Sequence, residues 1–292
     1  MRALFGSALT TERQREVNTL NAQSAASTLK ELAAFFSLTF LLSWMLFWAA
    51  AAVGPAPLNG PLYMLGVFTP SLVGLGLTAL AGGGNGIKAL LGRILAAPRS
   101  ARWYVFALGY MAAIKLASAV VYRIALGAWP TFGRDPLYVL PLAILVSTPV
   151  QAGEEIGWRG YALPRLASRL GLGPASILLG VLWAAWHWPF FVIPGVDKFG
   201  QSFPVYLASV TPLSVAFAWL YWRTQGSLLS TMLLHAAVNN TTNIVPSAAA
   251  APGSPLSLSA SPVAWIATAL LWSCAAFFLV QMRRAVLRGP DD

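Results

Sequence analysis

Long apolar segments alternate with short polar ones along most of the chain. A transmembrane helix needs about 20 largely apolar residues, and eight segments of this sequence reach that length. They are 31–53, 62–82, 103–126, 136–158, 174–194, 203–222, 227–246 and 261–282. The pattern predicts an all-α, polytopic integral membrane protein of about eight transmembrane helices, with residues 31–282 forming one helical domain.

The two ends of the chain are predicted to lie outside the membrane. Residues 1–30 lack the apolar stretch of about 7–15 residues that a signal peptide needs. Charged residues interrupt this stretch at Glu12, Arg13 and Glu16. We therefore expect residues 1–30 and 283–292 to form cytosolic tails.

A glycine-rich stretch at 82–86 follows the second span and predicts a flexible turn. After it, apolar residues recur at helical spacing from Ile87 to Leu95, with Lys88 and Arg93 between them. This spacing is typical of an amphipathic helix that lies at the membrane interface.

Composition supports the membrane assignment. The chain is 57% hydrophobic and 10% charged, whereas soluble domains are about 25% charged. The net charge of +10 could indicate a nucleic-acid partner, but the basic residues lie at the ends of apolar segments and not on one stripe. We expect them to face lipid headgroups, with no nucleic-acid partner. A single cysteine, Cys274, excludes an intrachain disulfide.

The Lys and Arg residues in short loops predict the orientation, because such residues concentrate on the cytosolic side. With both termini inside, the opposite side holds only Arg123, Arg134 and Lys198. All the other loop and tail basic residues fall on the cytosolic side. The content of Ala, Gly, Leu and Trp is typical of a bacterial protein, so the expected location is the inner (plasma) membrane.

Two adjacent glutamates, Glu154 and Glu155, lie near the cytosolic end of the fourth predicted span, whereas the other acidic residues lie in tails, at span ends or in loops. An intramembrane carboxylate costs a few kcal/mol, so it is a functional candidate by default. Arg159 follows Glu155 by four residues and shares its helical face. These residues could form a catalytic site, or simply an ion pair that fixes helix register.

Both histidines also lie in predicted spans. Trp183 lies four residues before His187, and Asn239 lies one helical turn after His235. A neutral imidazole can exchange a proton or bind a metal near neutral pH. Each of these polar residues, taken singly, could instead form a hydrogen bond between helices. Together, however, they predict one site within residues 136–246.

Three motifs carry a family resemblance. They are Glu154-Glu155-x-x-x-Arg159, an aromatic residue four before His187, and His235-x-x-x-Asn239. Together they resemble the CAAX protease and bacteriocin-processing (CPBP or Abi) family, which includes the Ras-converting type II CAAX prenyl endopeptidases. The resemblance covers about 150–243. Trp183 departs from the pattern, which usually has Phe there.

The resemblance implies a glutamate-type intramembrane endopeptidase that acts on a membrane-associated protein or peptide, with a cavity open toward the cytosol and no cofactor. Glu154 would be the general base, and His187 would hold the attacking water. His235 and Asn239 would form the oxyanion hole, while Glu155 and Arg159 would brace the site. Trp183 would line the substrate pocket.

Other interpretations remain open. Glu154, His187 and His235 could together hold a zinc ion with water as the fourth ligand, although they do not form a His-Glu-x-x-His motif. The chain could be a non-enzymatic immunity or scaffold protein that retains the motifs for packing. It could also be a transporter with a proton relay, which Lys115 in the third span would favour.

Overall fold

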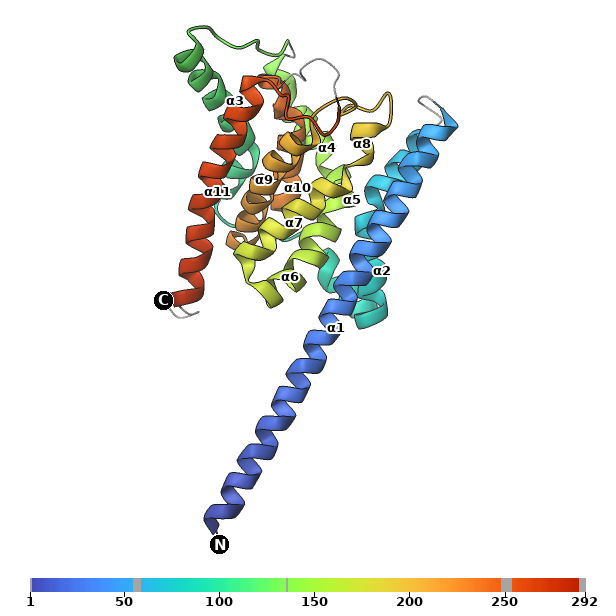
Figure 1. Cartoon of the computed structure of the whole chain (residues 1–292), viewed down its shortest axis with the longest axis vertical. Helices are drawn as coiled ribbons and strands as arrows, with labels where there is room; N and C mark the ends of the chain where they lie inside the picture. Colours follow the sequence, from blue (N-terminus) through green and yellow to red (C-terminus); the bar gives the residue numbers. More distant parts are fainter. Residues whose placement is uncertain (1, 55–58, 135, 248–253, 289–292) are drawn as a thin grey trace.

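The computed structural model describes residues 2–54, 59–134, 136–247 and 254–288, and side chains over 27–54, 59–134, 136–247 and 254–283. Within these ranges every regular element is a helix, and the fold is an all-α membrane bundle (Figure 1). The α-helices are α1 (Arg2–Val53), α2 (Gly60–Gly92), α3 (Ala101–Leu126), α4 (Leu140–Ser147), α5 (Ala152–Glu155), α6 (Leu163–Leu170), α7 (Leu172–Trp186), α8 (Pro189–Val192), α9 (Phe203–Arg223), α10 (Leu228–Thr241) and α11 (Pro262–Arg288). Short 3-10 segments are η1 (Leu137–Val139), η2 (Thr148–Gln151) and η4 (Thr242–Ile244), and η3 (Ile156–Ala162) is a π-helix.

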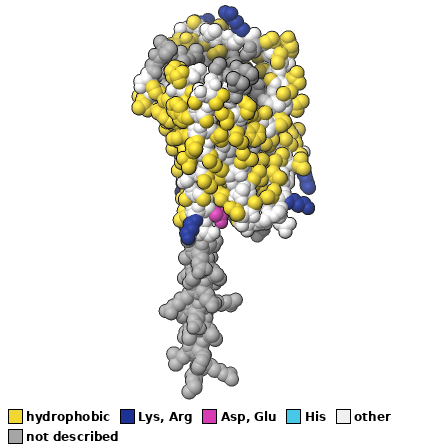
Figure 2. Space-filling view, turned by 90° about the vertical axis from the view of Figure 1, so that its right-hand side faces the viewer, with side chains coloured by type: hydrophobic (Ala, Val, Ile, Leu, Met, Phe, Trp, Pro, Cys, Tyr) yellow, Lys and Arg dark blue, Asp and Glu magenta, His cyan; other side chains and the backbone are white. Residues whose placement is uncertain are grey.

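The outer face of the bundle is hydrophobic. Figure 2 shows a broad hydrophobic band over the bundle, with Lys and Arg side chains only toward its two ends. Large apolar side chains that are more than half exposed include Leu41, Met45, Val105, Ile124 and Leu145. Such a surface is stable in contact with lipid, which confirms the predicted class.

Seven helical segments of the described chain are long and apolar enough to cross a membrane. The expected eighth, 227–246, is not among them, because α10 has only 14 residues and is roughly 21 Å long. Its first residue nevertheless lies beside the α2–α3 connection, where the Leu228 amide donates to the Arg93 carbonyl (2.9 Å). Lys115, midway along α3, donates to the carbonyl of Val245 just beyond the other end of α10 (3.1 Å). This short passage through the protein interior explains why the N-terminal end of α1 and the C-terminal end of α11 lie on the same side of the bundle (Figure 1).

Both predicted tails are continuous with helices over their described part. Helix α1 begins at Arg2 and α11 ends at Arg288, so neither expected boundary, at 30 or at 283, is a helix end. Residues 289–292 lie outside the described part of the chain. The expected turn at 82–86 is a kink at Gly83 (φ 56°, ψ −152°), and the segment after it remains helical to Gly92. A positive φ of this kind suits glycine, which has no side chain to clash.

The helical run that bears the glutamates is longer than the sequence pattern predicted. It extends over Leu137–Leu170, 34 residues, instead of ending at 158. The expected span ended directly before Arg159, since an arginine normally lies at the edge of a span. Here Arg159 is fully buried and paired with Glu155, so it does not have to reach the membrane surface. Glu154 and Glu155 consequently lie at the middle of the run and not near its cytosolic end.

Helix α2 packs closely against the π-helix that follows the glutamates. Gly157 is pressed against the Pro70 backbone, and a Cβ atom at Gly153 would lie 2.8 Å from the Phe68 ring. The Ser71 hydroxyl donates to the Ala152 carbonyl (2.6 Å) and accepts from the Gly157 amide (3.1 Å). Ser71 thus bridges a carbonyl and an amide that ordinary α-helical pairing leaves apart, and it stabilises the π-helix.

Candidate active site

Glu155 is the most enclosed ionisable residue of the site. It is fully buried at the C-terminal end of α5, and its Oε1 atom accepts hydrogen bonds from Arg159 Nη1 (2.8 Å) and His235 Nδ1 (2.9 Å). Arg159 lies four residues later, within the π-helix. A buried charge without partners would be costly, and these two contacts offset that cost.

Arg159 is held between two aromatic rings. Its guanidinium carbon lies 4.2 Å from the centroid of the Trp183 ring on α7 and 4.1 Å from the Phe217 ring on α9. A cation over a ring face is stabilised electrostatically, more strongly when the pair is shielded from water. Arg159 therefore joins the π-helix to α7 and α9 as well as neutralising Glu155.

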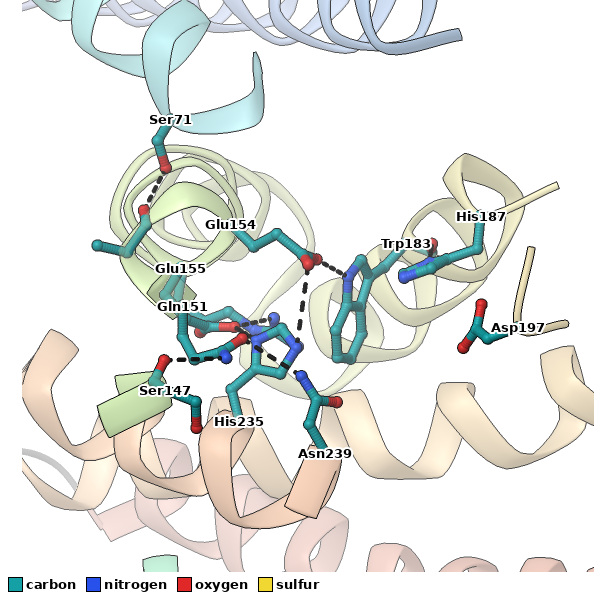
Figure 3. A network of polar contacts seen from close by, with 12 residues as sticks. Ser71, Ser147, Gln151, Glu154, Glu155, Trp183, His187, Asp197, His235 and Asn239 are labelled. Atoms are coloured by element: carbon teal, nitrogen blue, oxygen red, sulfur yellow. Dashed lines mark hydrogen bonds and ion pairs between the residues drawn. The ribbon is translucent and has the colours of Figure 1, made fainter. Parts of the chain in front are cut away.

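Glu154 projects to a different side of the helix from Glu155 and has a different environment. The Trp183 indole donates from Nε1 to Glu154 Oε2 (2.7 Å), and Glu154 Oε1 lies 4.0 Å from His235 Nε2 (Figure 3). A separation of 4.0 Å is too long for a direct hydrogen bond. One oxygen of the Glu154 carboxylate is therefore held, and the other faces an imidazole across a gap.

The hydrogen bonds of the two histidines define which ring nitrogen carries the proton. Nδ1 of His187 lies 2.8 Å from the Trp183 carbonyl, and Nδ1 of His235 lies 2.9 Å from the Glu155 carboxylate. Both partners can only accept, so in each ring Nδ1 carries the proton. In these assigned tautomers Nε2 of each ring carries no proton and can accept a hydrogen bond.

Asn239 lies one turn beyond His235, near the end of α10, and it is exposed. Its amide nitrogen donates to the side-chain oxygen of Gln151 (3.4 Å), and Gln151 in turn donates to the Ser147 carbonyl (3.2 Å). Gln151 is a buried polar residue that sequence reasoning missed. Its position three residues before Glu154, on the same face of the run, was the signal that could have identified it.

The structure brings most of the expected site residues together. Direct contacts join Glu154 to Trp183 and Glu155 to His235 (Figure 3). Arg159 contacts both Glu155 and Trp183. His187 joins them through the Trp183 carbonyl, and Asn239 through Gln151.

The alternative zinc set is not assembled as a ligand group. Among the described residues, no three His, Cys, Asp or Glu side chains are close enough together to hold a metal ion. The zinc alternative itself stays a prediction from the sequence.

Lys115 takes no part in this network. Its amine is buried and donates to the Val245 carbonyl (3.1 Å) and the Ser247 hydroxyl (2.6 Å). It neither reaches the membrane surface nor pairs with Glu154 or Glu155. Lys115 thus secures the segment that follows α10, and it does not extend the site toward a charged pathway.

The depth of the site differs from the expectation. Helix α6, which carries Arg165 and Arg169, lies at the lower end of the bundle in Figure 1, and Arg223 is the last residue of α9. His187 directly follows the last residue of α7, and Asn239 lies near the last residue of α10. Both residues are therefore at the helix ends that lie away from these arginines. The site therefore lies toward the middle of the membrane and away from the basic end, and the side to which its cavity opens stays a prediction.

The geometry defines a polytopic membrane protein whose helices enclose buried Glu and His side chains, with the exposed Asn239 beside them. Residues 136–241 match the family of type II CAAX prenyl endopeptidases described as Rce1-like. The CAAX prenyl protease 2 of Methanococcus maripaludis is 32% identical over 115 residues, which are 37% of this chain and 41% of that protein. The aligned part of the chain thus spans about two fifths of that relative's length. The segment that carries the whole site thus matches the Rce1-like CAAX protease family, in agreement with the resemblance of the three motifs.

Proposed function

We propose that this chain is a glutamate-type intramembrane endopeptidase that hydrolyses a peptide bond in a membrane-associated protein or peptide. The observation that carries the proposal is the gap between Glu154 Oε1 and His235 Nε2, which are 4.0 Å apart. A water molecule can bridge two polar groups at such a separation. The family match of residues 136–241 supports the same reaction class.

In the proposed mechanism Glu154 is the general base. Its free oxygen takes a proton from water while the water oxygen bonds to the carbonyl carbon of the scissile peptide. Nε2 of His187 would accept the second hydrogen of that water and orient it, which requires the water to reach past the Trp183 indole that stands between Glu154 and His187 in Figure 3. Glu154 then passes its proton to the leaving amine as the peptide bond breaks. A positioned base of this kind contributes about 10²–10⁴-fold to the rate.

His235 and Asn239 would stabilise the negative oxygen of the tetrahedral intermediate. His235 Nδ1 donates to Glu155, so a donor at Nε2 requires the doubly protonated ring, with the Glu155 carboxylate on its far side. The Asn239 amide would have to exchange its long contact with Gln151 (3.4 Å) for the substrate oxygen. Loss of one such donor typically raises the barrier by about 2.7–4 kcal/mol.

The substrate class follows from the position of the site. Glu154 and His235 are buried among membrane-spanning helices, so the scissile segment has to enter from the membrane or its surface. The Methanococcus maripaludis relative is named for CAAX prenyl proteins. A peptide with a C-terminal CAAX sequence, with and without a prenyl group, is therefore the first substrate to test.

The proposal is tested with the purified protein in detergent and a fluorescence-quenched peptide of this type. Glu154→Ala should lower kcat by at least about 100-fold with little change in thermal stability. Glu31→Ala is a matched control, because Glu31 is a carboxylate about one third exposed that pairs with Arg165 (2.8 Å) away from the site. Wild-type activity in Glu154→Ala would refute the mechanism, and activity that chelators remove and Zn²⁺ restores would replace it with metal-dependent hydrolysis.

A further inference from the structure

Trp183 on α7 contacts four of the residues assigned to the site. Its indole nitrogen donates to Glu154 (2.7 Å) and its carbonyl accepts from His187 (2.8 Å). Its ring faces the Arg159 guanidinium at 4.2 Å and packs edge-on against His235, with ring centroids 5.4 Å apart. In Figure 3 the indole stands between Glu154 and His187.

The side chain of Trp183 is itself immobilised. It is 3% exposed, and the Phe217 ring packs against it edge-on at 5.5 Å. A residue so enclosed offers little surface to a substrate, which argues against a pocket-lining role. An indole has one donor and no acceptor, so a fixed indole directs its N–H to one point.

We propose that Trp183 is a positioning residue that fixes the general base. Its N–H holds Glu154 Oε2 and thereby leaves Oε1 facing Nε2 of His235, while its carbonyl fixes the ring of His187. The inference rests on the proposed function. It is specific to this chain in one respect, because the phenylalanine usual at this position of the motif has no donor for Glu154.

The substitution Trp183→Phe removes the donor and keeps an aromatic ring beside Arg159. Hydrogen bonds to charged groups are stronger than neutral ones, so kcat should fall about 10- to 100-fold. KM should change little, because the ring does not line the substrate path. A rise in KM with unchanged kcat would overturn the positioning role and restore the pocket-lining one.

Trp186 provides a matched control on the same helix. It is also buried, at 1% exposure, and its indole nitrogen has no hydrogen-bond partner. Trp186→Phe therefore removes an indole N–H of equal burial without removing a contact to Glu154. Trp186→Phe should keep kcat within about twofold of the wild type. An equal loss of kcat in both variants would mean that either indole matters only for packing, and the proposal would be overturned.

A spectroscopic measurement separates this inference from the proposed function. The indole ¹⁵N–¹H resonance of Trp183 is assigned by its absence in Trp183→Phe, and that of Trp186 likewise. In Glu154→Leu, which keeps the bulk but removes the acceptor, the Trp183 resonance should shift and the Trp186 resonance should not. If no peptide is cleaved by the wild type, the proposed function fails while this shift still establishes the contact. An unshifted Trp183 resonance would overturn the contact even in an active protease.

Discussion

Removal of the Arg159 side chain should destabilise the protein strongly. Arg159 and Glu155 are both fully buried, and their side chains are 2.8 Å apart. Arg159→Ala leaves the Glu155 charge without its cation, and loss of one partner from a buried pair costs about 3–5 kcal/mol. The guanidinium also loses its contacts with the rings of Trp183 and Phe217. With about 2–4 °C per kcal/mol for chains of this size, the Tm should fall by roughly 10 °C.

The assay is thermal unfolding in detergent, with Arg165→Ala as the control. Arg165 pairs with Glu31 at the same distance, 2.8 Å, but both side chains are about one third exposed. An exposed pair contributes about 0–1 kcal/mol, so Arg165→Ala should shift the Tm by only a few degrees. Equal Tm values for the two variants would refute the bracing role of Arg159. The double variant Glu155→Leu with Arg159→Met should recover stability, since apolar replacement of a buried pair is often neutral, but not activity, because His235 loses its acceptor.

Two further predictions concern helix packing and orientation. Gly157→Ala places a methyl group against the α2 backbone, so it should lower the Tm or prevent folding, whereas Gly76→Ala, with open space around it, should not. A Tm for Gly157→Ala equal to that of Gly76→Ala would contradict the close approach. In intact cells of a strain that expresses the chain in its inner membrane, a membrane-impermeant maleimide should label Asp197→Cys and not Arg99→Cys, because the basic end is predicted to be cytosolic. The reverse labelling pattern would invert the predicted orientation.

The sequence predicted the class of fold because its signal is local. Each span is recognised by the length and apolarity of one segment, which do not depend on its neighbours. The same rule failed where tertiary contacts replaced lipid. Helix α10 is only 14 residues long because it lies inside the bundle, and the run at Leu137–Leu170 continues past Arg159 because Glu155 neutralises that arginine.

The sequence predicts which residues make up the candidate site, but it does not predict their arrangement. Spacing places Glu155 and Arg159 on one face of a helix, and the motifs name His187, His235 and Asn239 as partners. Spacing does not say which side chain on another helix each one meets. The indole bond of Trp183 to Glu154 and the amide contact of Gln151 with Asn239 therefore emerged only from the packing of α7 and α10 against the glutamate helix.

The two adjacent glutamates differ because successive side chains on a helix point in different directions. Glu155 turns toward Arg159 and His235, and both contacts engage the same oxygen, Oε1. A proton taken up by Glu155 would weaken two hydrogen bonds in the interior, so this residue is poorly suited to act as the base. Glu154 has one oxygen held by an indole and one that faces the gap to His235. On the proposed mechanism the two carboxylates therefore have separate tasks, because Glu154 can accept a proton without breaking the internal network while Glu155 maintains it.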